Sequence, residues 1–225
     1  MKIYTFKLKV LSLILMFIEH IYNFIPNRIP VWITYPGRIV APIFFYFMVE
    51  GFFYARSRFW YAKRIFSWAI VMLLGTKLIL LLINVKTIDT MINSIYLNIF
   101  LSLGCGVVLL SVIEWIKDNK FDKLNILLGL VLLIAISRVM MFLGTNIFGV
   151  FMTLIFYFFR DKKKLMVVAY LGSFLTLKLG YMFIYNIPFT YKALFIDDFQ
   201  WMMVFGIIPI LIYSRERELN NIFSK

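Results

Sequence analysis

The sequence has very few of the groups on which soluble enzymes usually depend. Its 225 residues include one cysteine, Cys105, and one histidine, His20. A single cysteine excludes an intrachain disulfide and a cysteine-based zinc site, so we predict no metal. The sequence also contains no Walker-type or Gly-rich phosphate loop, and therefore nothing in it indicates nucleotide hydrolysis.

Acidic residues are also scarce. Eleven Asp and Glu stand against 24 Lys and Arg, which gives a net charge of +13. In a soluble protein this charge would suggest a nucleic-acid partner. Here the basic residues collect in short segments between apolar runs, which is the positive-inside pattern of membrane proteins. We therefore assign the charge to membrane topology and expect no nucleic-acid partner.

Apolar residues, in contrast, are abundant. They make up 63% of the chain, and aromatic residues make up 19%. Soluble domains are about half apolar, so most of this surface must face lipid or other helices. We predict an all-α, polytopic membrane helix bundle that forms a single domain over residues 1–225, with the lipid bilayer as its surroundings.

A membrane-spanning helix needs about 20 mostly apolar residues. The sequence offers eight such candidates, at residues 8–25, 37–55, 64–84, 92–113, 124–143, 147–159, 165–183 and 199–213. The sixth is short for a full crossing. The first apolar run continues into Glu19 and His20 without a small-residue cleavage site, so we interpret it as a retained helix rather than a signal peptide.

The loop charges predict the orientation. With the N-terminus inside, the basic residues of the inner segments are Lys2, Lys7, Lys9, Arg56, Arg58, Lys63, Arg64, Lys117, Lys120, Lys123, Arg160, Lys162, Lys163, Lys164, Arg215, Arg217 and Lys225. The outer segments hold only Arg28, Lys86 and Lys192, with Arg38 close by. The asymmetry predicts about eight transmembrane helices with both termini in the cytoplasm.

Several ionisable residues fall inside the predicted spans, namely Glu19, His20, Arg38, Glu50, Lys77, Arg138 and Lys178. Such residues are rare in membrane helices and are usually functional. From the helical rise, His20 and the basic members lie between the midplane and the outer interface. Snorkelling to the interface explains Arg38 and Lys178. It explains Lys77 and Arg138 less well, because they lie within apolar runs, and we therefore predict a cationic cavity that binds an anionic group.

His20 has the properties of a general base, because imidazole titrates near neutral pH. Glu19 is its sequence neighbour, but adjacent helical residues point about 100° apart and need not touch. We expect Glu19 to pair with Arg38 or Lys77. Glu50 is expected to pair with Arg56 or to line the inner mouth of the bundle.

Two adjacent runs, EHIYNFIP and YPGRIVAPIFFYFMVEGFFYARSRFWYAKRIF, resemble the TraX family of bacterial membrane proteins. The matching positions are Glu19–His20, Gly37–Arg38, Pro42, Phe44–Phe45, Glu50–Gly51–Phe52 and Arg56–Arg58. The run NIFLSLGCG, from Asn98 to Gly106, resembles the family's Asn-led motif. FGVFMTLIFYFFRDKKK resembles its Gly-Val…Tyr-x-x-Arg segment, at Gly149, Val150, Tyr157 and Arg160.

The resemblance implies acetyl transfer at the bacterial inner membrane. The family's founder is linked to N-terminal acetylation of a pilin subunit. The family is also similar to larger membrane acyltransferases that use a histidine and cytoplasmic acyl-CoA. The expected donor is acetyl-CoA, and the acceptor is an unidentified amine or hydroxyl of a peptide, sugar or lipid. The chain departs from the family at GTNIFG, which lacks an acidic residue, and in having no further helix after an Asn-Gly loop.

On this basis His20 is the expected catalytic base, with Glu19 and Arg38 as its partners. Oxyanion or substrate binding is assigned to Lys77, Arg138, Lys178, Glu50 and Asn98. The phosphates of acetyl-CoA are assigned to Arg56, Arg58, Lys63 and Arg64, through charge-assisted hydrogen bonds.

Three other functions compete with this one. A small transporter or flippase would use the cationic layer for an anionic solute or lipid, although no inverted repeat is present. A membrane Cys/His peptidase would pair Cys105 with His20. Cys105, however, falls about thirteen residues into its predicted helix, hence in the inner half, whereas His20 falls in the outer half. A structural or immunity-type membrane protein would need no substrate.

Overall fold

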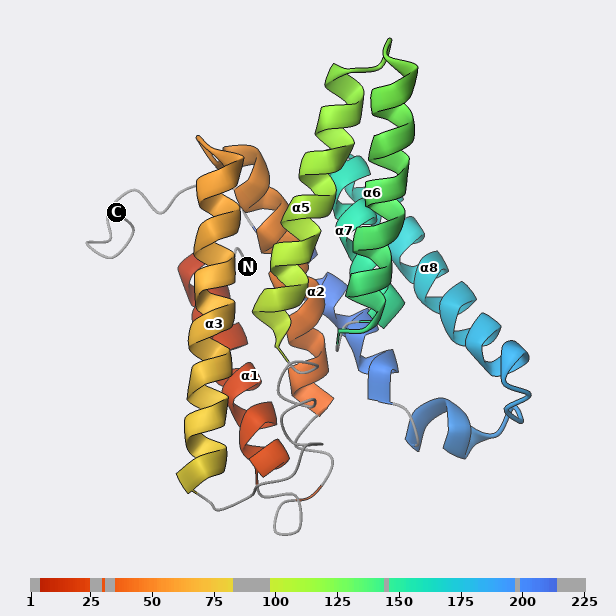
Figure 1. Cartoon of the computed structure of the whole chain (residues 1–225). Helices are drawn as coiled ribbons and strands as arrows, with labels where there is room; N and C mark the ends of the chain where they lie inside the picture. Colours follow the sequence, from red (N-terminus) through yellow and green to blue (C-terminus); the bar gives the residue numbers. More distant parts are fainter. Residues whose placement is uncertain are drawn as a thin grey trace. The chain divides into compact units, whose positions relative to one another are not determined.

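The computed structural model describes residues 5–24, 30, 35–82, 98–143, 146–196 and 199–213. Within these ranges the regular structure is helical and contains no strand, which confirms the all-α prediction. The long helices are α1 (Thr5–Phe24), α2 (Tyr35–Tyr54), α3 (Arg58–Leu82), α5 (Ile99–Asp118), α6 (Lys123–Met141), α7 (Asn146–Phe158) and α8 (Lys163–Ile184) (Figure 1). A turn of π-helix η2 (Lys192–Ile196), the 3₁₀ helix η3 (Phe199–Gly206) and α9 (Ile207–Ile212) follow.

Four of the described helices, α2, α5, α6 and α8, are long and apolar enough to cross a membrane. The helix α7 and the segment formed by η3 and α9 are shorter apolar helices. Only 11% of the apolar window of α6 is buried inside the protein, so most of that helix must be covered by lipid. The chain is therefore a membrane protein. The number of crossings and the side of each terminus stay predictions.

Each predicted span corresponds to a helical segment, but some ends differ. The helix α3 begins at Arg58, six residues before the predicted span, and α5 ends at Asp118, five residues after it. Asn119 caps α5, with its backbone N–H and its side-chain amide both donating to the carbonyl of Trp115. Helix ends are set by such caps, whereas an apolar run measures only the part suited to lipid.

The start of α5 and the last predicted helix also needed correction. The helix α5 begins at Ile99 rather than at residue 92, and residues 92–97 lie outside the described part of the chain. The predicted helix 199–213 consists of two pieces, η3 and α9, that meet at Gly206. A Cβ on Gly206 would lie 3.0 Å from both the carbonyl oxygen of Ile39 and the Cβ of Pro42, so η3 can approach α2 only because no side chain is present.

The chain divides into two compact units. The first comprises Met1–Phe44 and Asp161–Lys225, and the second comprises Phe45–Arg160. The helix α2 begins in the first unit and ends in the second. The prediction of a single domain over residues 1–225 stays a prediction.

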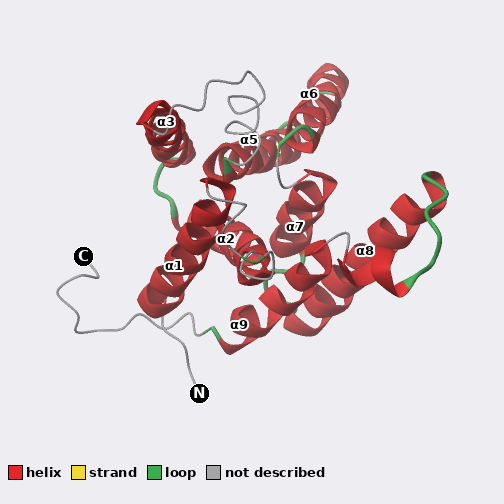
Figure 2. Cartoon of the chain, turned by 90° about the horizontal axis from the view of Figure 1, so that it is seen from below, coloured by secondary structure: helices red, strands yellow, loops and turns green. Residues whose placement is uncertain are grey.

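In the second unit, α5 lies between α3 and α6 and also contacts α7 (Figure 2). Its small residues allow this close packing. A Cβ on Gly104 would lie 2.7 Å from the ring of Phe66 on α3. A Cβ on Gly106 would lie 2.6 Å from Met48 on α2 and 3.2 Å from Thr153 on α7. The two glycines therefore fix three helix contacts, around a core formed by Phe45, Phe52, Leu109, Leu110, Met140 and Phe156.

In the first unit, α8 and η3 are joined by a buried hydrogen bond, in which the hydroxyl of Tyr170 donates to the carbonyl of Met203 at 2.7 Å. The rings of Tyr35 on α2 and Phe199 on η3 contact each other in a tilted arrangement, with their centroids 4.5 Å apart. The helix α8 ends where Asn186 takes a left-handed conformation, with φ of 50°. Asparagine tolerates this conformation better than most residues, and it turns the chain toward η2.

Candidate functional site

The helices α1 and α2 meet where Glu19 faces Gly37. A Cβ added to Gly37 would lie 2.7 Å from the Cβ of Glu19, so any larger residue would displace the carboxylate. This contact gives the Gly-Arg motif a physical basis: the glycine makes room for Glu19, and the next residue, Arg38, supplies a cation beside it.

Arg38 is a partner of Glu19, which confirms one of the two partners that were predicted. The Nε atom of Arg38 lies 3.5 Å from Oε1 of Glu19, and the two side chains are 31% and 16% exposed. The Arg38 Nε atom is itself buried, and it makes no hydrogen bond within the described part of the chain. A buried donor without a hydrogen bond is rare in folded proteins, and here the Glu19 carboxylate is the charge that faces it.

His20 follows Glu19 directly on α1, whose last residue is Phe24. The side chain of His20 lies outside the described part of the structure. Lys178, on α8 of the same unit, is buried at 8% exposure. Lys178 is therefore the most buried of the predicted basic site residues whose side chains the structure describes, and its part in binding an anionic group stays a prediction.

Lys77 and Arg138 belong to the second unit, and both side chains are exposed. Arg138 lies in the last turn of α6, and Lys77 lies five residues before the end of α3. Positions near helix ends are those from which long basic side chains reach the interface. The structure therefore favours snorkelling for these two residues, and their role in substrate binding stays a prediction.

Glu50 pairs with Arg160 and not with the predicted Arg56. The Arg160 guanidinium binds both carboxylate oxygens, with Nε 2.9 Å from Oε1 and a terminal nitrogen 3.2 Å from Oε2. Glu50 is 4% exposed, whereas Arg56 is exposed at the turn between α2 and α3. Sequence proximity suggested Arg56, but the packing of α7 against the end of α2 brings a residue 110 positions away into contact.

The residues after Glu50 bind α3. A Cβ on Gly51 would lie 2.8 Å from the ring of Tyr61, whose hydroxyl donates to the carbonyl of Met48 at 3.1 Å. Phe52 is buried, and the Arg58 guanidinium lies 4.9 Å from the centre of its ring. The Glu-Gly-Phe motif therefore connects the end of α2 to α7 and to α3.

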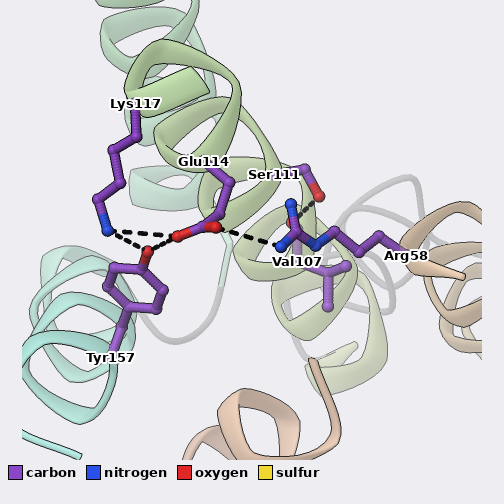
Figure 3. A network of polar contacts seen from close by, with 6 residues as sticks. All are labelled: Arg58, Val107, Ser111, Glu114, Lys117 and Tyr157. Atoms are coloured by element: carbon purple, nitrogen blue, oxygen red, sulfur yellow. Dashed lines mark hydrogen bonds and ion pairs between the residues drawn. The ribbon is translucent and has the colours of Figure 1, made fainter. Parts of the chain in front are cut away.

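A second group of charges, which we call the Glu114 cluster, consists of Arg58, Glu114, Lys117 and Tyr157 (Figure 3). Arg58 donates to Oε2 of Glu114 at 3.1 Å, and Lys117 donates to Oε1 at 3.2 Å. The Tyr157 hydroxyl donates to Oε1 of Glu114 and accepts from Lys117. The sequence interpretation used Lys117 only as a cytoplasmic loop charge and did not include Glu114, although a lone acidic residue in the run SVIEWIK was a possible signal.

These contacts gather three of the predicted cytoplasmic loops at one end of the second unit. Arg58 connects the start of α3 to the end of α5, and Tyr157 connects the end of α5 to the end of α7. Arg160 completes the set by connecting α7 to the end of α2. The residues predicted to bind acetyl-CoA, namely Arg56, Arg58, Lys63 and Arg64, are all exposed at this end.

Asn98 has a structural role in the described fold. It is the N-cap of α5, and its side-chain oxygen accepts from the N–H of Leu101 at 3.2 Å. Its amide nitrogen donates to the carbonyl of Ala69 on α3 at 2.8 Å. One end of this buried side chain therefore caps α5 and the other binds α3, and its part in substrate binding stays a prediction.

The corrected start of α5 changes the position of Cys105. Counted from Ile99, Cys105 lies roughly 9 Å along the helix, nearer the predicted outer end than the inner one. Depth therefore no longer argues against a cysteine peptidase. The packing of the flanking Gly104 and Gly106 still supports a structural role for this segment. The described residues contain no cluster of three or more His, Cys, Asp or Glu suited to a metal.

Comparison with known proteins identifies the family. A family model described as "TraX protein" matches residues 6–197. The chain belongs to the TraX family. The TraX match extends from α1 to η2 and beyond, and so includes Glu19, His20, Arg38 and the whole Glu114 cluster. No curated protein and no solved structure matches the chain significantly.

Proposed function

We propose that this membrane protein transfers an acetyl group from cytoplasmic acetyl-CoA to an amine or hydroxyl acceptor, with His20 as the general base. It would reside in the bacterial inner membrane, with eight crossings and both termini in the cytoplasm. Membership of the TraX family supports the proposal, because the family's founder is linked to acetylation of a pilin N-terminus.

The observation that carries the proposal is the geometry around Arg38. Its guanidinium is held beside Glu19 at 3.5 Å, on the helix next to the one that carries His20. Its buried Nε atom faces Oε1 of Glu19 at that distance and makes no hydrogen bond in the described part of the chain. A carbonyl oxygen that gains negative charge during acyl transfer is an acceptor of the required kind.

The chemistry follows from these groups. The acceptor nitrogen or oxygen attacks the thioester carbon, His20 takes the proton of the acceptor, and Arg38 stabilises the oxyanion. The carbon–sulfur bond then breaks, and the proton passes from His20 to the CoA thiolate. Glu19 keeps Arg38 in position. A general base of this kind contributes about 10²–10⁴ in rate.

The donor would arrive at the basic end of the second unit. Four exposed cations, Arg56, Arg58, Lys63 and Arg64, lie at the turn between α2 and α3 and the start of α3. Lys63 and Arg64 also lie over the rings of Trp60 and Tyr61, at 4.6 and 5.9 Å from the ring centres. Cations partly supported on aromatic rings are available to bind the phosphates of acetyl-CoA.

The test uses the full chain in nanodiscs. Acetyl-CoA binding and thioester hydrolysis are measured for the wild type and for His20→Ala. We expect binding in both and a loss of turnover of about 10²-fold or more in the variant. Full turnover in a folded His20→Ala variant would disprove the general-base role.

Two further samples separate the competing functions. Cys105→Ala should keep full turnover, whereas a Cys/His peptidase would lose all activity. A wild-type protein that binds no acetyl-CoA but moves an anionic solute across vesicles, with no covalent product, would instead be a transporter.

A further inference from the structure

The Glu114 cluster holds more positive than negative charge around a single carboxylate. Arg58 and Lys117 contact opposite oxygens of Glu114, and the Tyr157 hydroxyl lies against one of them (Figure 3). Two cations and one anion leave a net charge of +1. Guanidinium, ammonium and hydroxyl donors that converge on two oxygens also form the donor set that binds phosphate.

The cluster is open to solvent. The side chains of Arg58 and Lys117 are 46% and 51% exposed, and that of Glu114 is 21% exposed. Exposed ion pairs contribute little net stability, so another anion can replace Glu114 without a large loss of folding free energy. The contrast is Glu50, whose pair with Arg160 is buried and therefore resists exchange.

The surroundings favour a ligand of high negative charge. The exposed residues Arg56, Lys63, Arg64, Lys120 and Lys123 belong to the same turns and helix ends as the cluster. A local excess of one charge attracts an ion of the opposite sign over about 10 Å at physiological salt. A phosphate monoester, which carries close to two negative charges, gains more from this field than the single carboxylate of Glu114.

We propose that Arg58 and Lys117 form a phosphate-monoester site in which Glu114 occupies the place of the anion until the ligand displaces it. The phosphate then takes over the connection between α3 and α5 that Glu114 provides in its absence. Tyr157 donates to the phosphate in the same way as it does to Glu114. The site thus adds Lys117, Glu114 and Tyr157 to the cationic residues that were predicted from the sequence to bind phosphate. Glu114 has the role of the anion that the ligand displaces.

The phosphate has two chemical sources, the 3′-phosphate of CoA and the headgroup of phosphatidic acid. The first source rests on the proposed function, whereas the site itself does not. The probes are CoA and dephospho-CoA, which differ by that one phosphate, titrated into the full chain in phosphatidylcholine nanodiscs. The ratio of the two dissociation constants isolates the phosphate contribution from all other contacts.

We expect the wild type to bind CoA about tenfold more tightly than dephospho-CoA. Arg58→Gln and Lys117→Gln should reduce this preference toward one. Glu114→Gln should increase it, because the competing carboxylate charge is removed while the side chain keeps its shape. Lys123→Gln is the matched control: it removes one charge from the same end but makes no contact with Glu114 or Tyr157, so it should lower the ratio much less than Arg58→Gln or Lys117→Gln does.

The second arm replaces part of the nanodisc lipid by phosphatidic acid and measures the lipid retained on the purified protein by native mass spectrometry. Absence of CoA binding, together with phosphatidic acid retention that falls in Arg58→Gln and rises in Glu114→Gln, would establish the site with a lipid source. That outcome would count against the donor assignment alone. If the three cluster variants behave as the wild type toward both probes, or Glu114→Gln weakens binding as the cation variants do, the proposed site is wrong.

Discussion

Arg160 binds Glu50 through two nitrogen atoms, at 2.9 and 3.2 Å, and this pair joins the end of α7 to the end of α2. The Arg160 guanidinium also lies 4.4 Å from the ring centre of Phe53, which in turn stacks on Tyr157. One buried pair and one aromatic stack thus connect the Glu-Gly-Phe motif of α2 to the Tyr-x-x-Arg motif of α7.

The first prediction concerns this pair. Arg160→Met leaves the carboxylate of Glu50 buried without its cation, and we expect a loss of about 3–5 kcal/mol in the free energy of unfolding. The measurement is unfolding in mixed micelles with increasing denaturing detergent. The double variant Glu50→Gln with Arg160→Met should lose less than the two single variants added together. Strictly additive losses would mean that the pair is not coupled.

The second prediction uses two glycines with opposite surroundings. Gly51→Ala places a methyl group against the ring of Tyr61 and should destabilise the protein by about 1–3 kcal/mol. Gly75→Ala on α3 has no atom within 4 Å to meet, so it should be neutral or stabilise by up to about 1 kcal/mol through helix propensity. The same unfolding assay checks both, and equal effects would show that the contact between Gly51 and Tyr61 is not tight.

The third prediction concerns the geometry at Glu19. Gly37→Ala pushes the Glu19 side chain away from α2 and so disturbs the position of Arg38. If acetyl transfer is the activity, a displacement of about 1 Å near the reacting groups should lower turnover by about 10²-fold. Gly172→Ala on α8 is the control, because nothing lies within 4 Å of the added atom. Equal turnover in the two variants would remove Glu19 from the site.

The fourth prediction separates a structural from a substrate-binding role for Asn98. Asn98→Ser keeps a cap for α5 but loses the hydrogen bond to the carbonyl of Ala69, whereas Asn98→Ala loses both. A lost cap and a lost buried hydrogen bond each cost about 1 kcal/mol, so stability should fall stepwise from Asn to Ser to Ala. Turnover per folded molecule should stay constant. A turnover that falls while stability holds would instead assign Asn98 to substrate binding.

Much of the architecture could be read from the sequence. Apolar runs of the length that lipid requires predicted all eight helical segments, because hydrophobic thickness is a property of composition. The basic turn after α2 and the end of α7 were also predicted to share a side, and their contacts confirm that these ends meet. The pairing of Glu19 with Arg38 was one of two stated alternatives, since charge in a span needs a partner nearby.

Other features depended on packing and could not be read from the sequence. A pair with the nearby Arg56 was one of two expectations for Glu50, but its partner Arg160 follows α7, because which helix packs against the end of α2 is a tertiary property. The start of α5 was placed seven residues too early. The helix begins after its N-cap, Asn98, whereas the apolar run in the sequence begins before it. Lys117 and Arg160 were predicted only as loop charges or motif positions, and Glu114 was not named, because the contacts of all three depend on residues of other helices.

The sequence by itself determined that this chain is a helical membrane protein with its positive charge concentrated at particular turns. Apolar length and loop charge decide where helices lie and how they are oriented in a bilayer, and these rules apply to membrane proteins in general. Only the tertiary structure decided which charges meet. A carboxylate in low dielectric accepts whichever donors the packed helices bring within about 3 Å, and that choice is made by the small residues at which the helices touch.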